Sequence, residues 1–179
     1  MAPTTALLVV DVVTGIFALP EPLHEPESFL SNVTRLVTSA RHAGVLVVHV
    51  QHTGPEGSVF ARGSPAREFH PSVAPRPGEP LVDKDTPDSF LRSNLESVLR
   101  EAGIRELCVC GFATEGCIDT TVRSAWSRGF SVVLASDCHT TTRNAVLEAS
   151  QVVAHHNLVL RRFARVVPLA EVAFSAPAH

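Results

Sequence analysis

The sequence predicts an α/β protein with three layers, in which a mainly parallel sheet of five to six strands carries helices on both faces. Short, continuous runs of apolar and often β-branched residues are typical of strands buried on both sides. The segments between these runs have the length and the periodicity of amphipathic helices. Gly44, Gly103 and Gly129 stand where a helix should end and the next strand begin.

The apolar runs give the expected strands, at residues 6–12, 44–50, 106–111 and 130–135, with a short fifth strand at 165–168. Helices are expected between them, at residues 28–43, 89–102, 117–128 and 144–155. In the first of these, Phe29, Val33 and Leu36 fall on one face at helical spacing. Strands that alternate with helices in this way indicate parallel pairing.

The stretch from residue 53 to residue 80 differs, because it contains six prolines and four glycines. An irregular stretch of this length inside a compact domain is usually functional or disordered. We expect a loop that lies over the carboxyl edge of the sheet rather than a linker between domains. With 179 residues, the chain is expected to form a single domain over residues 1–179.

Composition excludes several classes of protein. Charged residues make up 18% of the chain and the net charge is −3, without a basic stripe, which argues against a nucleic-acid partner. The apolar runs are too short to cross a membrane, and residues 1–5 lack the positive charge of a signal peptide. The four cysteines do not have the density of a disulfide scaffold, so we expect a reduced, cytoplasmic protein.

Ligands of open, Rossmann-like sheets bind outside the carboxyl ends of the strands. Asp11 ends the first run, and could be a helix cap or a site residue; Lys84 lies in a charged stretch that could be a solvated loop. Cys117 follows a strand and opens a helix, where the helix dipole is expected to lower the pKa of a thiol. A thiolate near an acid and a lysine would be an activated nucleophile. Cys108 and Cys110 lie in mid-strand and are interpreted as core residues.

Three segments, in this order and spacing, resemble the isochorismatase-like cysteine hydrolase family, which includes nicotinamidases, carbamoylsarcosine amidohydrolase and ureidoacrylate hydrolases. The first is the strand that ends at Asp11, and the second is Lys84 followed by Pro-Asp-Ser-Phe. The third is Gly-Phe-Ala-Thr-Glu-Gly-Cys, which ends at Cys117 and is followed by Ile-Asp-Thr-Thr. The resemblance covers about residues 5–140.

The resemblance implies an Asp–Lys–Cys triad at Asp11, Lys84 and Cys117. It also implies a cis peptide bond between Phe112 and Ala113, and an oxyanion hole made by the backbone N–H groups of Ala113 and Cys117. The expected activity is hydrolysis of a C–N bond in a small amide or ureido substrate through a thioester intermediate.

Three alternatives to that activity stay open. Some isochorismatases cleave a vinyl ether and have no cysteine at this position, so the presence of Cys117 favours amide hydrolysis. A catalytically silent member of the fold, acting in binding or assembly, is the second alternative. A redox-active thiol protein that uses Cys117 with Cys138 is the third, although no Cys-x-x-Cys motif supports it.

Nicotinamidases of the family bind zinc through an Asp-x-His motif and a further histidine, but the corresponding residues here read Gln51-His52-Thr53. His52 and His70 could form at most a partial site, so we expect no metal and no cofactor. Phe17, His52 and Phe90 are expected to line the substrate pocket. The expected partners are a small-molecule substrate and further copies of the chain, in a homodimer or homotetramer.

Overall fold

Six parallel strands form one sheet in the order β3-β2-β1-β4-β5-β6, and the computed structural model describes residues 4–174 of the chain. The strands are β1 (Thr5–Val10), β2 (Leu46–His52), β3 (Leu81–Lys84), β4 (Glu106–Phe112), β5 (Ser131–Thr140) and β6 (Arg165–Val167). Each pair of neighbouring strands is parallel. The five expected runs are therefore strands, and β3, which ends at Lys84, is the sixth.

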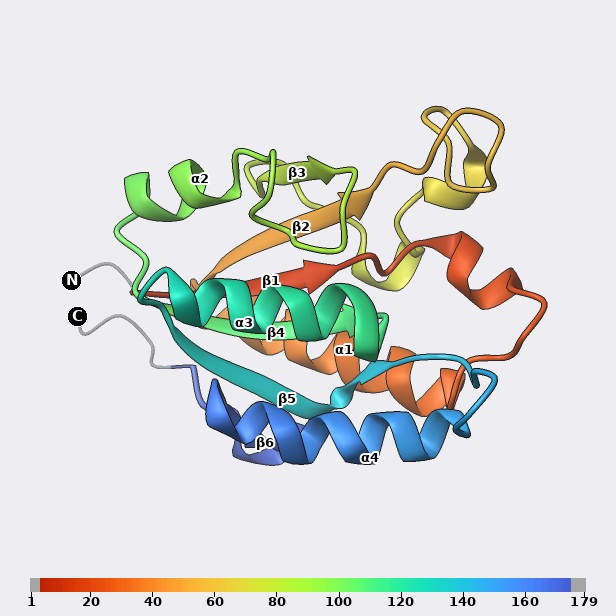
Figure 1. Ribbon diagram of the computed structural model, residues 1–179. Coiled ribbons are helices and arrows are strands. Elements are labelled where there is room, and N and C mark those ends of the chain that lie inside the picture. The colour runs from red at the N-terminus through yellow and green to blue at the C-terminus, as the bar shows by residue number, and fades with distance from the viewer. Residues whose placement is uncertain (1–3, 175–179) are drawn as a thin grey trace.

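Helices cover both faces of the sheet, which confirms the predicted three-layer α/β/α class. Helix α1 (Pro26–His42) lies behind the sheet in Figure 1, whereas α3 (Asp119–Ser127) and α4 (Ala149–Val159) lie in front of it, on the same side as α2 (Leu95–Glu101). Short 3₁₀ helices complete the described part: η1 (Thr14–Ala18), η2 (Pro65–Arg67), η3 (Pro71–Val73), η5 (Leu160–Arg162) and η6 (Leu169–Glu171). Within residues 4–174, no helix has the length and apolar character that a membrane span requires.

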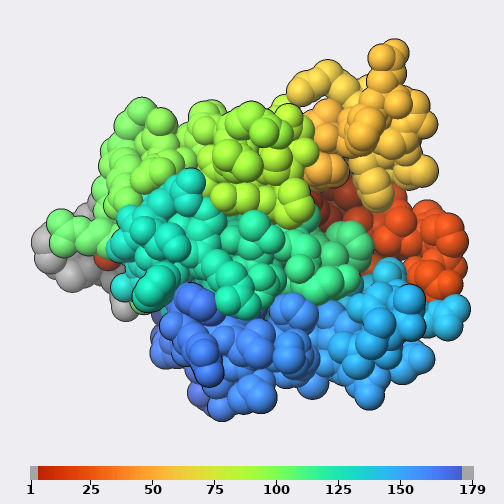
Figure 2. All heavy atoms as spheres, in the orientation of Figure 1, coloured from red at the N-terminus to blue at the C-terminus, as the bar shows by residue number. Residues whose placement is uncertain are grey.

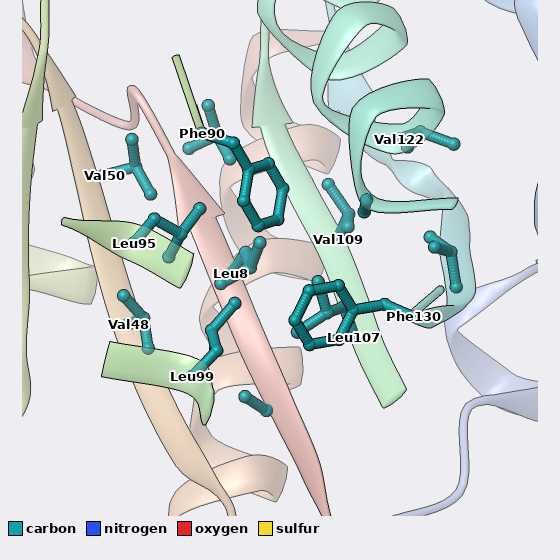
Figure 3. Packing of buried hydrophobic residues seen from close by; sticks show 14 of the residues in the cluster. Leu8, Val48, Val50, Phe90, Leu95, Leu99, Leu107, Val109, Val122 and Phe130 are labelled. Carbon is teal, nitrogen blue, oxygen red and sulfur yellow. The ribbon is translucent and has the colours of Figure 1, made fainter. Parts of the chain in front are cut away.

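The sheet separates two hydrophobic cores, because successive side chains of a strand point to opposite faces. Leu8 of β1 packs with Leu95 and Leu99 of α2 on one face, as Figure 3 shows. Leu7 of β1 belongs to the other core, with Phe29 of α1. Burial on both sides explains why β1 reads as a continuous apolar run.

Helices α2 and α4 begin five or more residues later than their patterns predict, because polar side chains hold the preceding backbone in turns. Helix α2 starts at Leu95 rather than at residue 89, and Asp88 accepts a hydrogen bond from the N–H of Phe90 at 2.8 Å. Helix α4 starts at Ala149 rather than at residue 144, since the side chain of Asn144 accepts hydrogen bonds from the two N–H groups that follow at positions 146 and 147.

The proline-rich segment over residues 53–80 lies against the carboxyl ends of β2 and β3, as expected. The guanidinium of Arg67 donates to the carbonyl of His52 at 2.9 Å, to Thr53 Oγ1 at 2.8 Å and to Asp83 Oδ1 at 2.6 Å. In Figure 2 the gold part of this segment stands next to the red segment that follows β1. The two segments together border the edge of the sheet where the candidate residues gather.

Candidate active site

Asp11, Lys84 and Cys117 meet at the carboxyl edge of the sheet. The ammonium of Lys84 lies 2.8 Å from Asp11 Oδ2 and donates to Cys117 Sγ at 3.1 Å. A third hydrogen bond runs from Lys84 to the carbonyl of Thr86 at 3.2 Å. Strand β2 separates β3 from β1 in the sheet, so the long side chain of Lys84 is what brings its charge to Asp11.

The carboxylate of Asp11 is positioned by its own backbone and by β2. Asp11 has a φ of 56°, in the left-handed region that aspartate enters more readily than most residues. Its N–H donates to the carbonyl of Val50 at 2.9 Å, and its Oδ1 accepts from the N–H of His52 at 2.7 Å. These bonds turn the side chain away from β1 and toward Lys84.

Both members of this ion pair are almost fully buried, with exposed fractions of 4% for Asp11 and 2% for Lys84. Burial alone would lower the pKa of Lys84, but the neighbouring Asp11 and Cys117 outweigh it and leave this pKa raised. The ammonium therefore stays charged in the range in which the protein would work.

The thiol of Cys117 does not have the lowered pKa that its place before a helix predicts. Burial, and then the adjacent carboxylate of Asp11, raise the pKa of Cys117 to about 11, although Lys84 acts in the opposite direction. The reason is local: Cys117 lies in a π-helical turn, η4 (Thr114–Ile118), and packs against the core instead of standing free at a helix end. The resting group is a thiol, and its reaction requires a base.

The chain around Cys117 has unusual backbone geometry. The peptide bond between Phe112 and Ala113 is cis. Gly111 has a φ of 128°, and a Cβ atom at this position would lie 1.9 Å from the carbonyl oxygen of Val10, so only glycine fits here. Among residues 4–174, the N–H of Ala113, which lies just before this turn, donates to no acceptor.

A cavity of about 110 Å³ opens beside this turn. Its lining consists of Asp11, Val13, Ile16, His52, Phe60, Phe112, Ala113, Gly116 and Cys117. The sequence does not identify Val13, Ile16 and Phe60 as lining residues. Ile16 belongs to η1, just after β1, and Phe60 belongs to the proline-rich segment. The sequence places both residues near a strand end, but it does not show which way their side chains point.

Of the three predicted pocket residues, only His52 lies in the cavity. Phe90 is 6% exposed and packs in the core against Phe130, with ring centroids 5.9 Å apart (Figure 3). Phe17 packs against Phe29 and His70 instead. The structure corrects both expectations, because these apolar rings face the two hydrophobic layers rather than the strand ends.

The residues at the position of the nicotinamidase zinc motif do not fit a metal ion. Gln51 is bound by Arg67, whose guanidinium donates to Gln51 Oε1 at 3.0 Å and whose carbonyl accepts from the Gln51 amide. His70 Nδ1 accepts from the N–H of Ser72 at 3.3 Å. Across residues 4–174, no group of three or more His, Cys, Asp or Glu side chains is placed to share a metal ion.

A buried network behind the cysteine turn was not found from the sequence. Asn157 donates from its amide to the carbonyl of Ser136 at 3.0 Å, so its Oδ1 accepts from His139 Nε2 at 3.0 Å. His139 Nδ1 is then left to accept from the hydroxyl of Thr114, at 2.9 Å. Burial lowers the pKa of His139 to about 4, which keeps the ring neutral. Thr114 begins the turn that carries Cys117, and this network fixes its position.

The protein is thus an α/β protein with an open parallel sheet and a site at its carboxyl edge, where an acid and a lysine surround a cysteine. The isochorismatase domain model matches residues 5–171. The chain belongs to the isochorismatase family.

Curated relatives with named activities include a streptothricin hydrolase and a maleamate amidohydrolase. Streptothricin hydrolase of Streptomyces noursei is 41% identical over 139 residues, which are 78% of this chain and 55% of the relative. The chain thus spans about half the length of the streptothricin hydrolases that it matches. Maleamate amidohydrolase of Pseudomonas putida is 28% identical, over 74% of this chain and 70% of the relative.

Solved structures share the fold over nearly the whole chain. An isochorismatase from Pseudomonas putida superposes with a TM-score of 0.89 and 30% identity, covering 95% of this chain and 90% of that one. A cysteine hydrolase from Pseudomonas syringae superposes with a TM-score of 0.85 and 25% identity, covering 94% and 90%. Both matches agree with the three-layer architecture described above.

Proposed function

We propose that this protein is a cysteine hydrolase that cleaves the C–N bond of a small amide or ureido substrate through a thioester on Cys117. The observation that carries the proposal is the position of one buried ammonium, that of Lys84, within 2.8 Å of Asp11 and 3.1 Å of Cys117, beside an open cavity. The names of two similar proteins, an amidohydrolase and a cysteine hydrolase, support the same chemistry.

In the acylation step, Asp11 takes the proton of the Cys117 thiol as the sulfur attacks the substrate carbonyl. The ammonium of Lys84 stabilises the negative charge that develops on sulfur. The N–H groups of Ala113 and Cys117 donate to the carbonyl oxygen as it becomes an oxyanion. Removing one such donor typically costs about 10²–10³ in rate.

The tetrahedral intermediate collapses when Asp11 returns its proton to the leaving nitrogen, which departs as ammonia or an amine. Water then attacks the thioester and gives a proton to Asp11. When the C–S bond breaks, that proton returns to the sulfur of Cys117 and the acid product leaves. Asp11 thus serves first as base and then as acid in both acylation and deacylation, while Lys84 keeps its charge throughout.

The proposal is tested by ammonia release from a panel of small primary amides, followed with the purified protein and with Cys117→Ala. We expect release by the native protein and a loss of at least about 10³-fold in the variant. Ammonia release by Cys117→Ala at the native rate would contradict the thioester mechanism. If the native protein cleaves none of the amides and never carries an acyl group on Cys117, the silent-fold alternative is favoured.

We also propose that the enzyme is a homo-oligomer of single-domain subunits. Sedimentation of the purified chain tests this directly. A strict monomer at all concentrations would contradict it.

A further inference from the structure

The walls of the cavity beside Cys117 are apolar on several sides. Val13 and Ile16 come from the segment after β1, Phe60 from the proline-rich segment, and Phe112 from the end of β4. The two rings and two aliphatic side chains enclose the space into which an acyl group would extend from the sulfur. At about 110 Å³, this space is smaller than the roughly 300–1,000 Å³ of common ligand pockets.

The cavity offers no free positive charge within the described residues. The one ammonium at its base, that of Lys84, is already bonded to Asp11, Cys117 and the carbonyl of Thr86. The buried guanidinium of Arg67 is bonded to Asp83 and other acceptors at the ends of β2 and β3, and it does not line the cavity. A substrate carboxylate would therefore find no partner here.

Apart from the reacting groups Asp11 and Cys117, the polar side chain in the lining is that of His52. Burial, followed by the nearby Lys84, lowers the pKa of His52, so its ring contributes no charge. Its Nδ1 is buried and has no hydrogen-bond partner among the described residues. His52 thus supplies a neutral polar contact at the base of the cavity, next to Asp11, while the rest of the wall is apolar.

We propose that the substrate is an amide of a compact, uncharged and apolar acid, and that the cavity rejects half-amides of dicarboxylic acids and amides of cationic acids. This inference rests on the proposed function, because it takes the cavity as the acyl site. A charged acyl group would lose its hydration without gaining a counter-charge, and such burial is strongly unfavourable. An apolar acyl group of the same length would gain from burial against Ile16 and Phe60.

Three amides of equal chain length test the inference: butyramide, succinamate and β-alaninamide, whose acyl chains end in a methyl, a carboxylate and an ammonium. Each is added to the native protein at matched ionic strength, and the rate of Cys117 alkylation by iodoacetamide is followed. We expect butyramide to halve this rate at a concentration at least ten times lower than either charged amide. Equal or better protection by a charged amide, or none by butyramide at 100-fold excess over the reagent, would overturn the inference.

Ammonia release in the same samples separates the two claims. Selective protection by butyramide without ammonia would leave the apolar acyl site standing and contradict the hydrolase. Ammonia release with unselective protection would contradict the acyl-site inference alone. In neither case does the failure of one claim conceal the other.

A gain of charge gives the sharper test. In Phe60→Lys, an ammonium replaces one apolar wall, and we expect the preference for butyramide over succinamate to fall at least ten-fold. Val59→Lys is the matched control, because Val59 is the preceding residue, is 63% exposed and does not line the cavity. An unchanged preference in Phe60→Lys, or an equal change in Val59→Lys, would show that this wall does not select the acyl group.

Discussion

Two ion pairs lie beside the sheet: that of Asp11 and Lys84 is buried, and that of Glu79 and Arg41 is partly buried. They differ in whether a group remains available for reaction. Glu79 receives two hydrogen bonds from Arg41, both at 2.8 Å, and others from the N–H of Arg76 and from His49. These bonds use the whole carboxylate, and they tie the end of the proline-rich segment to α1 and β2. The pair of Asp11 and Lys84 is just as short, at 2.8 Å, but it also faces a thiol and a cavity.

The two clusters also differ in whether they hold a proton that can be exchanged. Burial alone would raise the pKa of Glu79, but the hydrogen bonds from Arg41 and from the N–H of Arg76 outweigh it and lower this pKa to about 2. Such a carboxylate does not exchange protons near neutral pH. At the other cluster, the raised pKa of Cys117 keeps a proton on sulfur until a base removes it. Charges shielded from solvent are common to both clusters. The cluster of Asp11 and Lys84 differs in that Cys117 holds a proton that a base can remove and a cavity opens beside it, whereas the Glu79 cluster only joins parts of the fold.

The largest expected effect is on the thiol. Cys117→Ala should lose at least about 10³-fold in kcat/KM while keeping the native fold, since the nucleophile is gone. Cys138→Ala is the control, because burial raises the pKa of Cys138 and its side chain lies away from the cavity. Amide turnover and circular dichroism of the two variants make the comparison. Equal losses in both would mean that Cys117 matters only for packing.

Removing the cation from each ion pair distinguishes a role in the reaction from a role in stability alone. Lys84→Met leaves Asp11 buried without its partner, so it should destabilise the protein by about 3 kcal/mol. Arg41→Met should destabilise it less, because Glu79 is only partly buried and keeps its bonds from the N–H of Arg76 and from His49. The expected difference is in kcat of the folded protein, which should fall about 10²-fold for Lys84→Met and stay native for Arg41→Met. Urea unfolding and turnover are the measurements. A native kcat in Lys84→Met would remove Lys84 from the mechanism.

Acid should weaken the fold through the buried histidines. The pKa of His139 is lowered from 6.5 to about 4, so its contribution is fully present above pH 6.5 and is lost as the pH falls from 6.5 toward 4. At about 1.4 kcal/mol per pKa unit, this loss is on the order of 3 kcal/mol. His49, whose pKa is also lowered by burial, acts in the same direction. Urea unfolding at pH 7 and at pH 4.5 should show the loss, and His139→Gln should reduce it. An equally steep pH dependence in that variant would assign the effect elsewhere.

The smallest expected effect is on the turn that carries the cysteine. Thr114→Val removes the hydrogen bond to His139, and should cost about 1 kcal/mol of stability together with a few-fold fall in kcat at unchanged KM. Thr121→Val is the control, since the Thr121 hydroxyl is hydrogen-bonded to Ser89, at 2.8 Å from its hydroxyl, and not to His139. A fall in kcat for both variants would indicate general loosening rather than positioning.

Much of this architecture can be predicted from sequence, because the signals involved are local. Continuous apolar runs locate the strands, and their carboxyl ends locate Asp11 and Cys117. Side-chain direction is not local: Phe90 was expected in the cavity but belongs to the core, whereas Phe60 comes to the cavity from an irregular segment. The pKa of Cys117 was expected to fall with the helix dipole, yet it rises, because burial is a property of the packed fold.

The central claim is that Cys117 is the acylated nucleophile, and p-nitrophenyl butyrate tests it most directly. We predict a burst of about one p-nitrophenol per subunit and one butyryl group on the peptide that contains Cys117, lost again to water. Asp11→Asn should slow both phases, and Cys117→Ala should show neither. No butyryl group on Cys117, or an equal burst from Cys117→Ala, would contradict the account.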